Sequence, residues 1–226
     1  MNKKKAAQLI RLLKREYPNA RCTLDYRTPI QLVVATILSA QSTDERVNLI
    51  TPALFHKYRS VCAFAATRRT ELEQLIEPVG LYRNKAKNII ALTQRLVTDF
   101  HSRVPRTIKQ LQSLAGIGRK SANVIKGELY GEPEGIAVDT HVARLSYRLG
   151  LTDQTEPRKV EQDLMNWIER SDWILISHLL IQHGRNTCKA RLPQCDDCVL
   201  ESLCPRNGVP ANQRKSSSAK TSASKR

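Results

Sequence analysis

The segment Leu114–Lys120 has the residue types of a phosphate-binding turn. Gly116 and Gly118 lie between two helical patterns and allow the chain to reverse within a few residues. Such a turn presents backbone N–H groups on one side, and a helix beginning at Arg119 adds the positive end of its dipole. The segment therefore predicts a hairpin on which a phosphate sits while Arg119 or Lys120 reaches past it. The alternative is that the two glycines merely end one helix and begin the next.

Asp139 follows about one helix and one loop downstream, in the sequence Val138-Asp139-Thr140-His141. It stands where the N-cap would be for a helix over residues 140–149 that Gly150 closes. Most aspartates at such a position are structural, so the residue type alone does not give Asp139 a catalytic role.

Four cysteines within 17 residues predict a metal site: Cys188, Cys195, Cys198 and Cys204. Thiolates suit either a tetrahedral zinc ion or a [4Fe–4S] cluster. The compact and unequal spacing C-x6-C-x2-C-x5-C favours the cluster, because structural zinc sites usually pair two short knuckles across a longer gap. Disulfides would require an oxidising compartment, and residues 1–16 lack the continuous apolar core of a signal peptide.

The charge of the chain points to a phosphate polymer as its partner. Thirty-seven Lys and Arg against 21 Asp and Glu give a net charge of +16, far beyond what solubility requires. No apolar run approaches the ~20 residues of a membrane-spanning helix. The 226 residues are enough for one large or two small domains with a real core.

The elements that must position these residues are nearly all helical by pattern. Helices are expected over residues 1–16, 29–40, 70–76, 84–100, 108–114, 119–129, 140–149, 157–169 and 172–183. The segment 29–40 is apolar on nearly every side and should be the buried central helix. A capping-box pattern from Ser42 to Glu45 predicts the start of the next helix. Gly184 is expected to stop the last one.

With hairpin, aspartate and cysteine run in this order, the chain resembles the endonuclease III family of helix-hairpin-helix DNA glycosylases. The resemblance covers residues 1–206 and rests on 114–120, 138–141, Leu38-Ser39-Ala40-Gln41, Gly80-Leu81-Tyr82 and the four cysteines. One departure is Ala115, where the family usually has proline. This change affects the turn but neither glycine nor the lysine.

The resemblance implies an all-α fold of two helical domains. One is a six-helix domain at 22–133 that contains the helix-hairpin-helix at about 108–130. The other is discontinuous, made of residues 1–21 and 134–206, and carries the iron–sulfur cluster loop. Residues 207–226 are expected to form a disordered basic tail. DNA would bind across the cleft between the domains.

The resemblance also implies a bifunctional base-excision DNA glycosylase and abasic-site lyase. It would remove oxidised pyrimidines and nick the strand on the 3′ side by β-elimination, with Lys120 and Asp139 as catalytic residues. An attacking lysine must be neutral, and at a pKa of ~10.4 only about one lysine in 2,500 is neutral at pH 7. Partial burial and the charge of Arg119 are expected to favour the neutral amine. Asp139 is expected to stabilise positive charge on the sugar and to assist proton transfer.

A damaged base must leave the stack before its sugar can be attacked, so side chains must fill the gap. By resemblance these are Gln41 and Leu81. The residues expected to bind DNA are Gln41, Leu81, Gly116, Gly118, Arg119 and His141. The expected cofactor is a [4Fe–4S] cluster, with no catalytic metal. The expected partner is double-stranded DNA that contains damaged bases or abasic sites, and no membrane partner is expected. The protein is expected to be a cytoplasmic, nucleoid-associated monomer.

Three alternatives remain open at this point. A mismatch adenine glycosylase shares the scaffold, but it typically lacks the hairpin lysine and carries a further C-terminal domain for which 226 residues leave no room. A pyrimidine-dimer glycosylase of the same superfamily keeps the lysine and is not separated by motif. The third is a non-catalytic helix-hairpin-helix DNA-binding module, against which the combination of Lys120 and Asp139 argues.

Overall fold

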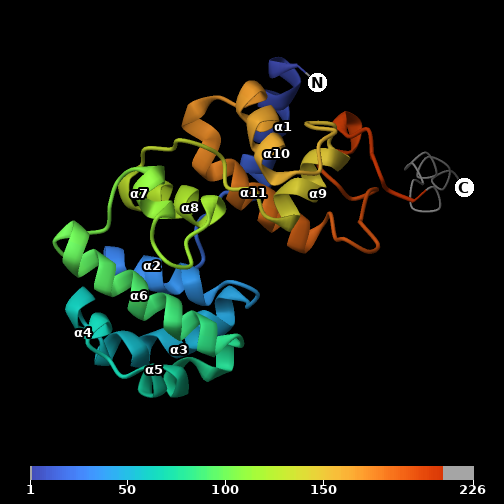
Figure 1. Ribbon diagram of the computed structural model, residues 1–226. Helices are drawn as coiled ribbons and strands as arrows, with labels where there is room; N and C mark the ends of the chain where they lie inside the picture. The colour runs from blue at the N-terminus through green and yellow to red at the C-terminus, as the bar shows by residue number, and fades with distance from the viewer. Residues whose placement is uncertain (1, 211–226) are drawn as a thin grey trace, which may run out of the picture. The chain divides into compact units, whose positions relative to one another are not determined.

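The computed structural model describes residues 2–210, and all regular structure within them is helical (Figure 1). The predicted all-α fold is confirmed. The chain divides into two compact units. Unit 1 combines Met1–Arg21 with Gly135–Arg226, and unit 2 is Cys22–Glu134. The sequence prediction had placed the second boundary one residue earlier, between 133 and 134.

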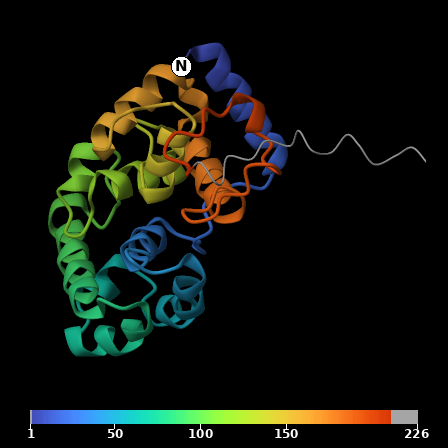
Figure 2. The ribbon, with the colours of Figure 1, turned by 90° about the vertical axis from the view of Figure 1, so that its right-hand side faces the viewer.

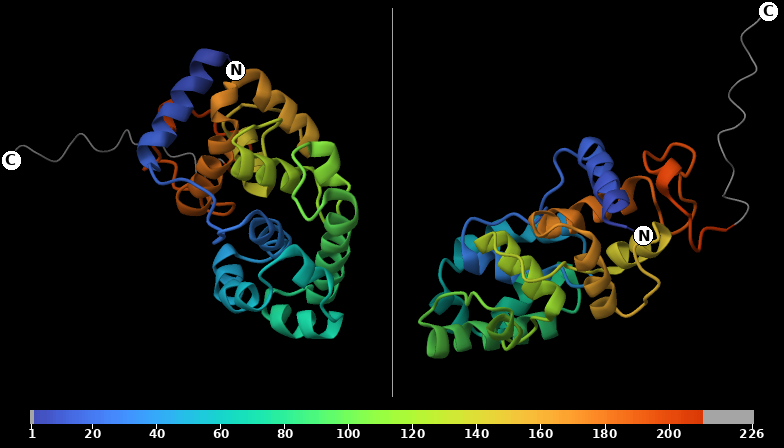
Figure 3. Two further views of the ribbon diagram at one scale, coloured as in Figure 1. Left: turned by 90° about the vertical axis from the view of Figure 1, so that its left-hand side faces the viewer. Right: turned by 90° about the horizontal axis from the view of Figure 1, so that it is seen from above.

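Unit 2 is built around α2 and α6. Its helices are α2 (Pro29–Leu38), α3 (Asp44–Lys57), α4 (Val61–Ala65), α5 (Arg69–Ile76), η1 (Glu77–Val79), α6 (Tyr82–Phe100), α7 (Ile108–Gln112) and α8 (Arg119–Tyr130). Eight of the ten residues of α2 are buried, as the apolar pattern on all its sides predicted. The long α6 packs against α2, α4 and α5 (Figure 3). The five-residue α4 was not among the helices expected from the sequence.

Unit 1 joins the two ends of the described chain. Its helices are α1 (Lys3–Glu16), α9 (Thr140–Arg148), α10 (Pro157–Trp167), η2 (Arg170–Asp172), α11 (Trp173–Asn186) and η3 (Glu201–Leu203). The α1 helix packs against α11 (Figures 1 and 2). Its buried residues are Ala6, Leu9, Ile10 and Leu13. This stripe repeats at helical spacing, and each buried leucine in it contributes about 1.5–3 kcal/mol to folding.

Two predicted capping signals are wrong, and several predicted helices differ from the observed ones by two residues at one end. The N-cap of α3 is Thr43, whose side chain accepts a hydrogen bond from the backbone N–H of Arg46, so the capping box does not start at Ser42. Gly184 does not stop α11, which continues to Asn186. A Cβ atom at Gly184 would lie 3.0 Å from Nη2 of Arg144. The glycine therefore allows α9 to approach α11 closely and has no role as a helix terminator.

The packed part of the chain extends beyond the expected start of the tail at residue 207. The backbone N–H of Asn207 donates to the carbonyl oxygen of Arg148 at 3.2 Å, and Val209 is buried. The rest of the predicted tail, residues 211–226, lies outside the described residues. Among the helices of residues 2–210, none is both long enough and apolar enough to cross a membrane.

Candidate functional site

The hairpin lies in unit 2, between α7 and α8. Gly116 has a φ of +79°, and a Cβ there would lie 3.0 Å from the side chain of Asn88. The turn therefore requires glycine at this position, both for its backbone conformation and for its packing. Leu114 and Ile117 are buried and fix the turn to the core of unit 2.

Gly118 has a different role in the same turn. Its φ is −85°, which any residue can adopt, and no atom lies within 4 Å of the position of a Cβ. It is the N-cap of α8 and gives no side-chain cap to the first turn. The first N–H groups of a helix have no intrahelical acceptor and carry the positive end of the dipole. The open space beside Gly118 therefore suits a phosphate oxygen.

Lys120 occupies the first turn of α8 and is exposed, while Arg119 before it is half-buried. The hairpin thus presents an exposed amine two residues after the N-cap of α8. The partial burial that the sequence analysis expected for Lys120 is not provided by unit 2 itself.

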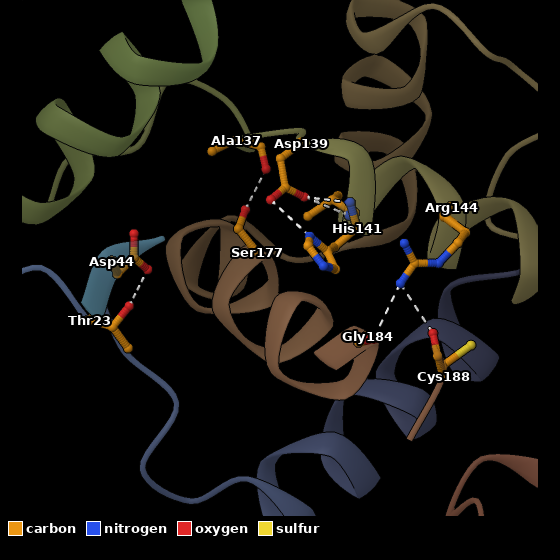
Figure 4. Close-up of polar contacts among 10 residues, drawn as sticks. Thr23, Asp44, Ala137, Asp139, His141, Arg144, Ser177, Gly184 and Cys188 are labelled. Carbon is orange, nitrogen blue, oxygen red and sulfur yellow. Dashed lines mark hydrogen bonds and ion pairs between the residues drawn. The ribbon is translucent and has the colours of Figure 1, made fainter. Parts of the chain in front are cut away.

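Asp139 is the N-cap of α9 in unit 1, as its position predicted (Figure 4). Its Oδ1 accepts hydrogen bonds from the backbone N–H groups of His141 at 2.8 Å and Val142 at 2.9 Å. Its Oδ2 lies 3.4 Å from Nδ1 of His141. The carboxylate is half-buried. One oxygen is therefore fixed by the helix, and the other faces the ring of His141.

Residues of α11 contact the segment and the helix on either side of Asp139 (Figure 4). The hydroxyl of Ser177 donates to the carbonyl oxygen of Ala137 at 2.9 Å and so holds the extended segment that leads into Asp139. A Cβ atom placed on Gly184 would lie 3.1 Å from Cδ2 of His141. Nη2 of Arg144 donates to the carbonyl oxygens of Gly184 at 3.3 Å and Cys188 at 3.2 Å. These contacts tie the helix of Asp139 to the start of the cysteine-containing loop.

Gln41 and Leu81 lie in unit 2 and share an unusual backbone conformation. Their φ angles are +54° and +47°, a left-handed region that bulky residues rarely adopt. Both side chains are exposed, and that of Leu81 keeps 53% of its surface accessible. Strained, exposed residues of this kind are concentrated at functional sites.

The four clustered cysteines line one pocket of unit 1. This pocket encloses about 400 Å³ of space between atoms, including space open to solvent. Its lining also includes Arg148, His183 and Arg206. Within residues 2–210, no three His, Cys, Asp or Glu side chains are arranged to hold a single metal ion.

Hydrogen-bond donors surround the sulfur atoms of this pocket. Nη1 of Arg148 donates to Sγ of Cys188 at 3.4 Å. The backbone N–H groups of Leu200 and Arg206 donate to Sγ of Cys198 and Sγ of Cys204, each at 3.4 Å. Donors of this kind stabilise thiolates and tune the group that the thiolates bind. Burial raises the pKa of the free Cys198 thiol to about 11, so binding a metal group there must release a proton.

His183 links this pocket to α1. Burial lowers its pKa to about 4, so its ring is neutral at pH 7. Nε2 lies 3.5 Å from Sγ of Cys198, and Nδ1 lies 2.9 Å from the hydroxyl of Tyr17. The tautomer of this ring follows the state of Cys198: with a thiolate there, which can only accept a hydrogen bond, Nε2 carries the proton and Nδ1 accepts from Tyr17.

The predicted site residues are divided between the units. Unit 2 holds Gln41, Leu81, Gly116, Gly118, Arg119 and Lys120, and unit 1 holds Asp139, His141 and the four cysteines. The pairing of Lys120 with Asp139 stays a prediction. Sequence reasoning missed Ser177 and Lys85. Lys85 is buried at helical spacing from Ile89 and Leu92, and a charge on that apolar stripe was the signal that could have revealed it.

Comparison with known proteins defines the class of this chain. Residues 34–170 match the family described as HhH-GPD superfamily base excision DNA repair protein. The chain is thus a helix-hairpin-helix enzyme of base excision DNA repair. It is 50% identical over 203 residues to endonuclease III of Synechocystis sp. (90% of this chain, 93% of that protein). It is 46% identical over 189 residues to endonuclease III of Bacillus subtilis (83% and 86%).

A solved structure shows the same relationship. It describes a trapped endonuclease III–DNA covalent intermediate with an estranged adenine, and it matches with a TM-score of 0.86 at 42% identity, covering 91% of this chain and 97% of that one. The chain belongs to the endonuclease III family.

Proposed function

We propose that this enzyme removes oxidised pyrimidines from duplex DNA and then nicks the abasic strand on the 3′ side, with Lys120 as nucleophile and Asp139 as the assisting carboxylate. The observation that carries the proposal is the exposed amine of Lys120, in the first turn of α8. It directly follows a turn suited to a backbone phosphate. That a related endonuclease III can be trapped covalently on DNA supports a covalent mechanism.

The residue types dictate the first step. The neutral amine of Lys120 attacks C1′ of the deoxyribose, and the glycosidic bond breaks with its electron pair leaving on the base, which takes up a proton. Positive charge develops on the sugar in the transition state. The carboxylate of Asp139 stabilises that charge and assists the proton transfer.

The second step breaks the strand. The sugar ring opens as the C1′–O4′ bond breaks and O4′ takes a proton, which leaves a Schiff base between C1′ and Lys120. Loss of a proton from C2′ then expels the 3′ phosphate by β-elimination. Water hydrolyses the Schiff base and restores the amine.

Base removal requires that the damaged nucleotide leave the stack. In this proposal Gln41 and Leu81 fill the space it leaves, since both are exposed and held in left-handed backbone conformations. Gly116, Gly118, Arg119 and His141 are proposed to contact the DNA around that position. The contacts from the hairpin hold the phosphate backbone in register and carry no sequence information.

We also propose that Cys188, Cys195, Cys198 and Cys204 hold a [4Fe–4S] cluster. The residues fit such a group, because the four thiols surround one pocket and N–H donors lie beside three of them. When bound, the cluster supplies structure to the loop that follows α11 and no catalytic group, because four thiolates occupy all its irons. Within residues 2–210 no three of these side chains are arranged to hold a single metal ion, which argues against a lone zinc ion with Zn–S bonds of ~2.3 Å.

The partner in this proposal is double-stranded DNA that contains damaged bases or abasic sites. The net charge of +16 favours association with any duplex, and the hairpin and the inserted side chains add the preference for damage. The enzyme is proposed to act as a cytoplasmic monomer on the nucleoid.

A substrate panel tests the proposal. Duplexes that contain one thymine glycol, one cyclobutane pyrimidine dimer or no lesion are incubated with the enzyme, and free base and 3′ nicks are measured separately. Base release followed by nicking of the thymine-glycol duplex is expected. Action on the dimer alone would instead identify a pyrimidine-dimer glycosylase. Binding without base release or nicking would identify a non-catalytic DNA-binding module.

A further inference from the structure

Lys85 is a buried lysine in the first turn of α6, with 4% of its surface accessible. Its Nζ donates hydrogen bonds to the carbonyl oxygen of Leu38 at 2.8 Å and to that of Val79 at 2.9 Å. Burying an ammonium group is costly unless its donors are satisfied. Consistent with that cost, burial lowers the pKa of Lys85. An apolar side chain would fill the same space without this cost, so the two hydrogen bonds require an explanation.

The two acceptors belong to the segments that carry Gln41 and Leu81. Leu38 ends α2, three residues before Gln41, and Val79 ends η1, two residues before Leu81. In addition, the backbone N–H of Lys85 donates to the carbonyl oxygen of Leu81 at 3.1 Å. One residue therefore contacts both segments, close to the positions where the backbone becomes left-handed.

We propose that Lys85 is a positioning residue that fixes the spacing between the Gln41 segment and the Leu81 segment, so that both side chains enter the duplex together. The proposal rests on the DNA-inserting roles of Gln41 and Leu81 proposed above. An ammonium group serves this purpose because its several donors on one atom can bridge two carbonyl oxygens. Without it, two buried carbonyls would lose their partner and the segments would be free to move apart.

The test compares two steps of the same reaction. Release of a stacked base needs the inserted side chains, whereas cleavage at a preformed abasic site has no base to unstack. Lys85→Met keeps an unbranched side chain and removes the donors. It is expected to slow single-turnover release of thymine glycol by about 10²-fold, the cost of a misplacement of ~1 Å. Cleavage of the abasic duplex should change by less than about threefold, because its chemistry does not depend on base extrusion.

A second readout follows the insertion directly. With 2-aminopurine opposite the lesion, the wild-type enzyme should change the fluorescence as the estranged base loses its stacking partner. Lys85→Met should reduce the amplitude of this change. If the variant is insoluble, Lys85→Gln keeps two N–H donors on a shorter side chain and should show the same pattern with a smaller effect, on the order of tenfold in base release.

Lys126 provides a matched control. It is also a buried lysine of unit 2, with 6% of its surface accessible, and its Nζ donates to the carbonyl oxygen of Arg106 at 2.9 Å and pairs with Glu134. Lys126→Met should destabilise unit 2 without changing the ratio of base release to abasic cleavage. The same change of ratio in both variants would overturn the proposal, because general destabilisation would explain it.

A double-mutant cycle separates this proposal from the one on which it rests. Gln41→Ala with Leu81→Ala should slow base release, and adding Lys85→Met should slow it little further. If the Gln41 and Leu81 variants keep the wild-type rate, their inserting roles are wrong. If they are slow but Lys85→Met keeps the wild-type ratio of the two steps, those roles stand and the positioning role of Lys85 is wrong.

Discussion

Oδ1 of Asp139 accepts the backbone N–H of Val142 at 2.9 Å. The carboxylate is thereby held at the start of α9 by the helix that it caps, and only Oδ2 remains to face the ring of His141. Structural and proposed catalytic roles are thus divided between the two oxygens of one side chain.

This division makes Asp139→Asn an informative variant. The amide keeps an oxygen for the cap but loses the charge, so the protein should fold normally and release the base about 10² times more slowly or worse. Asp139→Ala also loses the cap and should unfold about 1 kcal/mol more easily. Thermal unfolding and single-turnover base release measure the two effects. Equal base release by Asp139→Asn and the wild type would remove Asp139 from the mechanism.

Lys120→Gln should abolish covalent trapping of the enzyme on a thymine-glycol duplex by borohydride, which reduces the Schiff base. Affinity for the damaged duplex should stay largely intact, because phosphate contacts survive. Lys109→Gln is the matched control, since Lys109 is an exposed lysine on the other helix of the hairpin, and it should be trapped normally. Trapping of Lys120→Gln at the wild-type rate would place the nucleophile elsewhere.

The two hairpin glycines should respond differently to alanine. Gly116→Ala must adopt a positive φ and displace Asn88, so it should destabilise the fold by about 1–2 kcal/mol. Gly118→Ala meets no protein atom and should cost no more than about 1 kcal/mol, because an N-cap position prefers glycine to alanine. Its methyl group would instead occupy the space proposed for phosphate and weaken duplex binding about tenfold. Unfolding and binding titrations of both variants test this, and normal binding by a folded Gly118→Ala would argue against the phosphate site.

The cluster proposal predicts about four irons per chain and no stoichiometric zinc in protein purified without oxygen. Cys195→Ser should lose the brown colour and most of the soluble yield, because binding of the group and folding of the loop are coupled. Cys62→Ser is the control, since Cys62 is exposed and lies in unit 2, and it should keep the iron. A colourless wild type with one zinc per chain is the result that contradicts the proposal.

Removing residues 211–226 deletes five positive charges and no negative ones. Binding should weaken to damaged and undamaged duplexes alike, and the dependence of affinity on salt should become less steep. Titrations at several salt concentrations measure both. Loss of discrimination between the two duplexes, with unchanged affinity for the undamaged one, would show a different role for this segment.

Local patterns were enough to predict most helices and the hairpin. The all-sided apolar character of α2, the glycines of the turn and the capping position of Asp139 are visible in short stretches of sequence. Gly184 was misread because the reason for it lies in another helix: the side chains of Arg144 and His141 would lie only 3.0 and 3.1 Å from a Cβ. A glycine near a helix end has the same local pattern whether it stops the helix or admits a neighbour.

The charge of Lys85 on the apolar stripe of α6 is visible in the sequence, but the groups that it binds are hidden there for a similar reason. Its acceptors are main-chain carbonyls, which every residue has, and one of them is 47 positions away. The positive φ angles of Gln41 and Leu81 were equally hidden, because glycine is the residue that normally marks such a conformation. Thr43 rather than Ser42 caps α3, although both residue types favour that position.

The pairing of α1 with α11 has a consequence for biosynthesis. All residues of unit 2 have been synthesised once the chain reaches Glu134. The apolar stripe of α1, in contrast, cannot pack until α11, which begins at Trp173, has been synthesised. At ~5–20 residues per second, a ribosome needs about 8–30 s to make the chain from Glu16 to Trp173. During that time Leu9 and Leu13 have no native partner in α11. The apolar stripe of the N-terminal segment is therefore exposed to aggregation while the chain is being made, and the contact of Tyr17 with His183 is among the last to form.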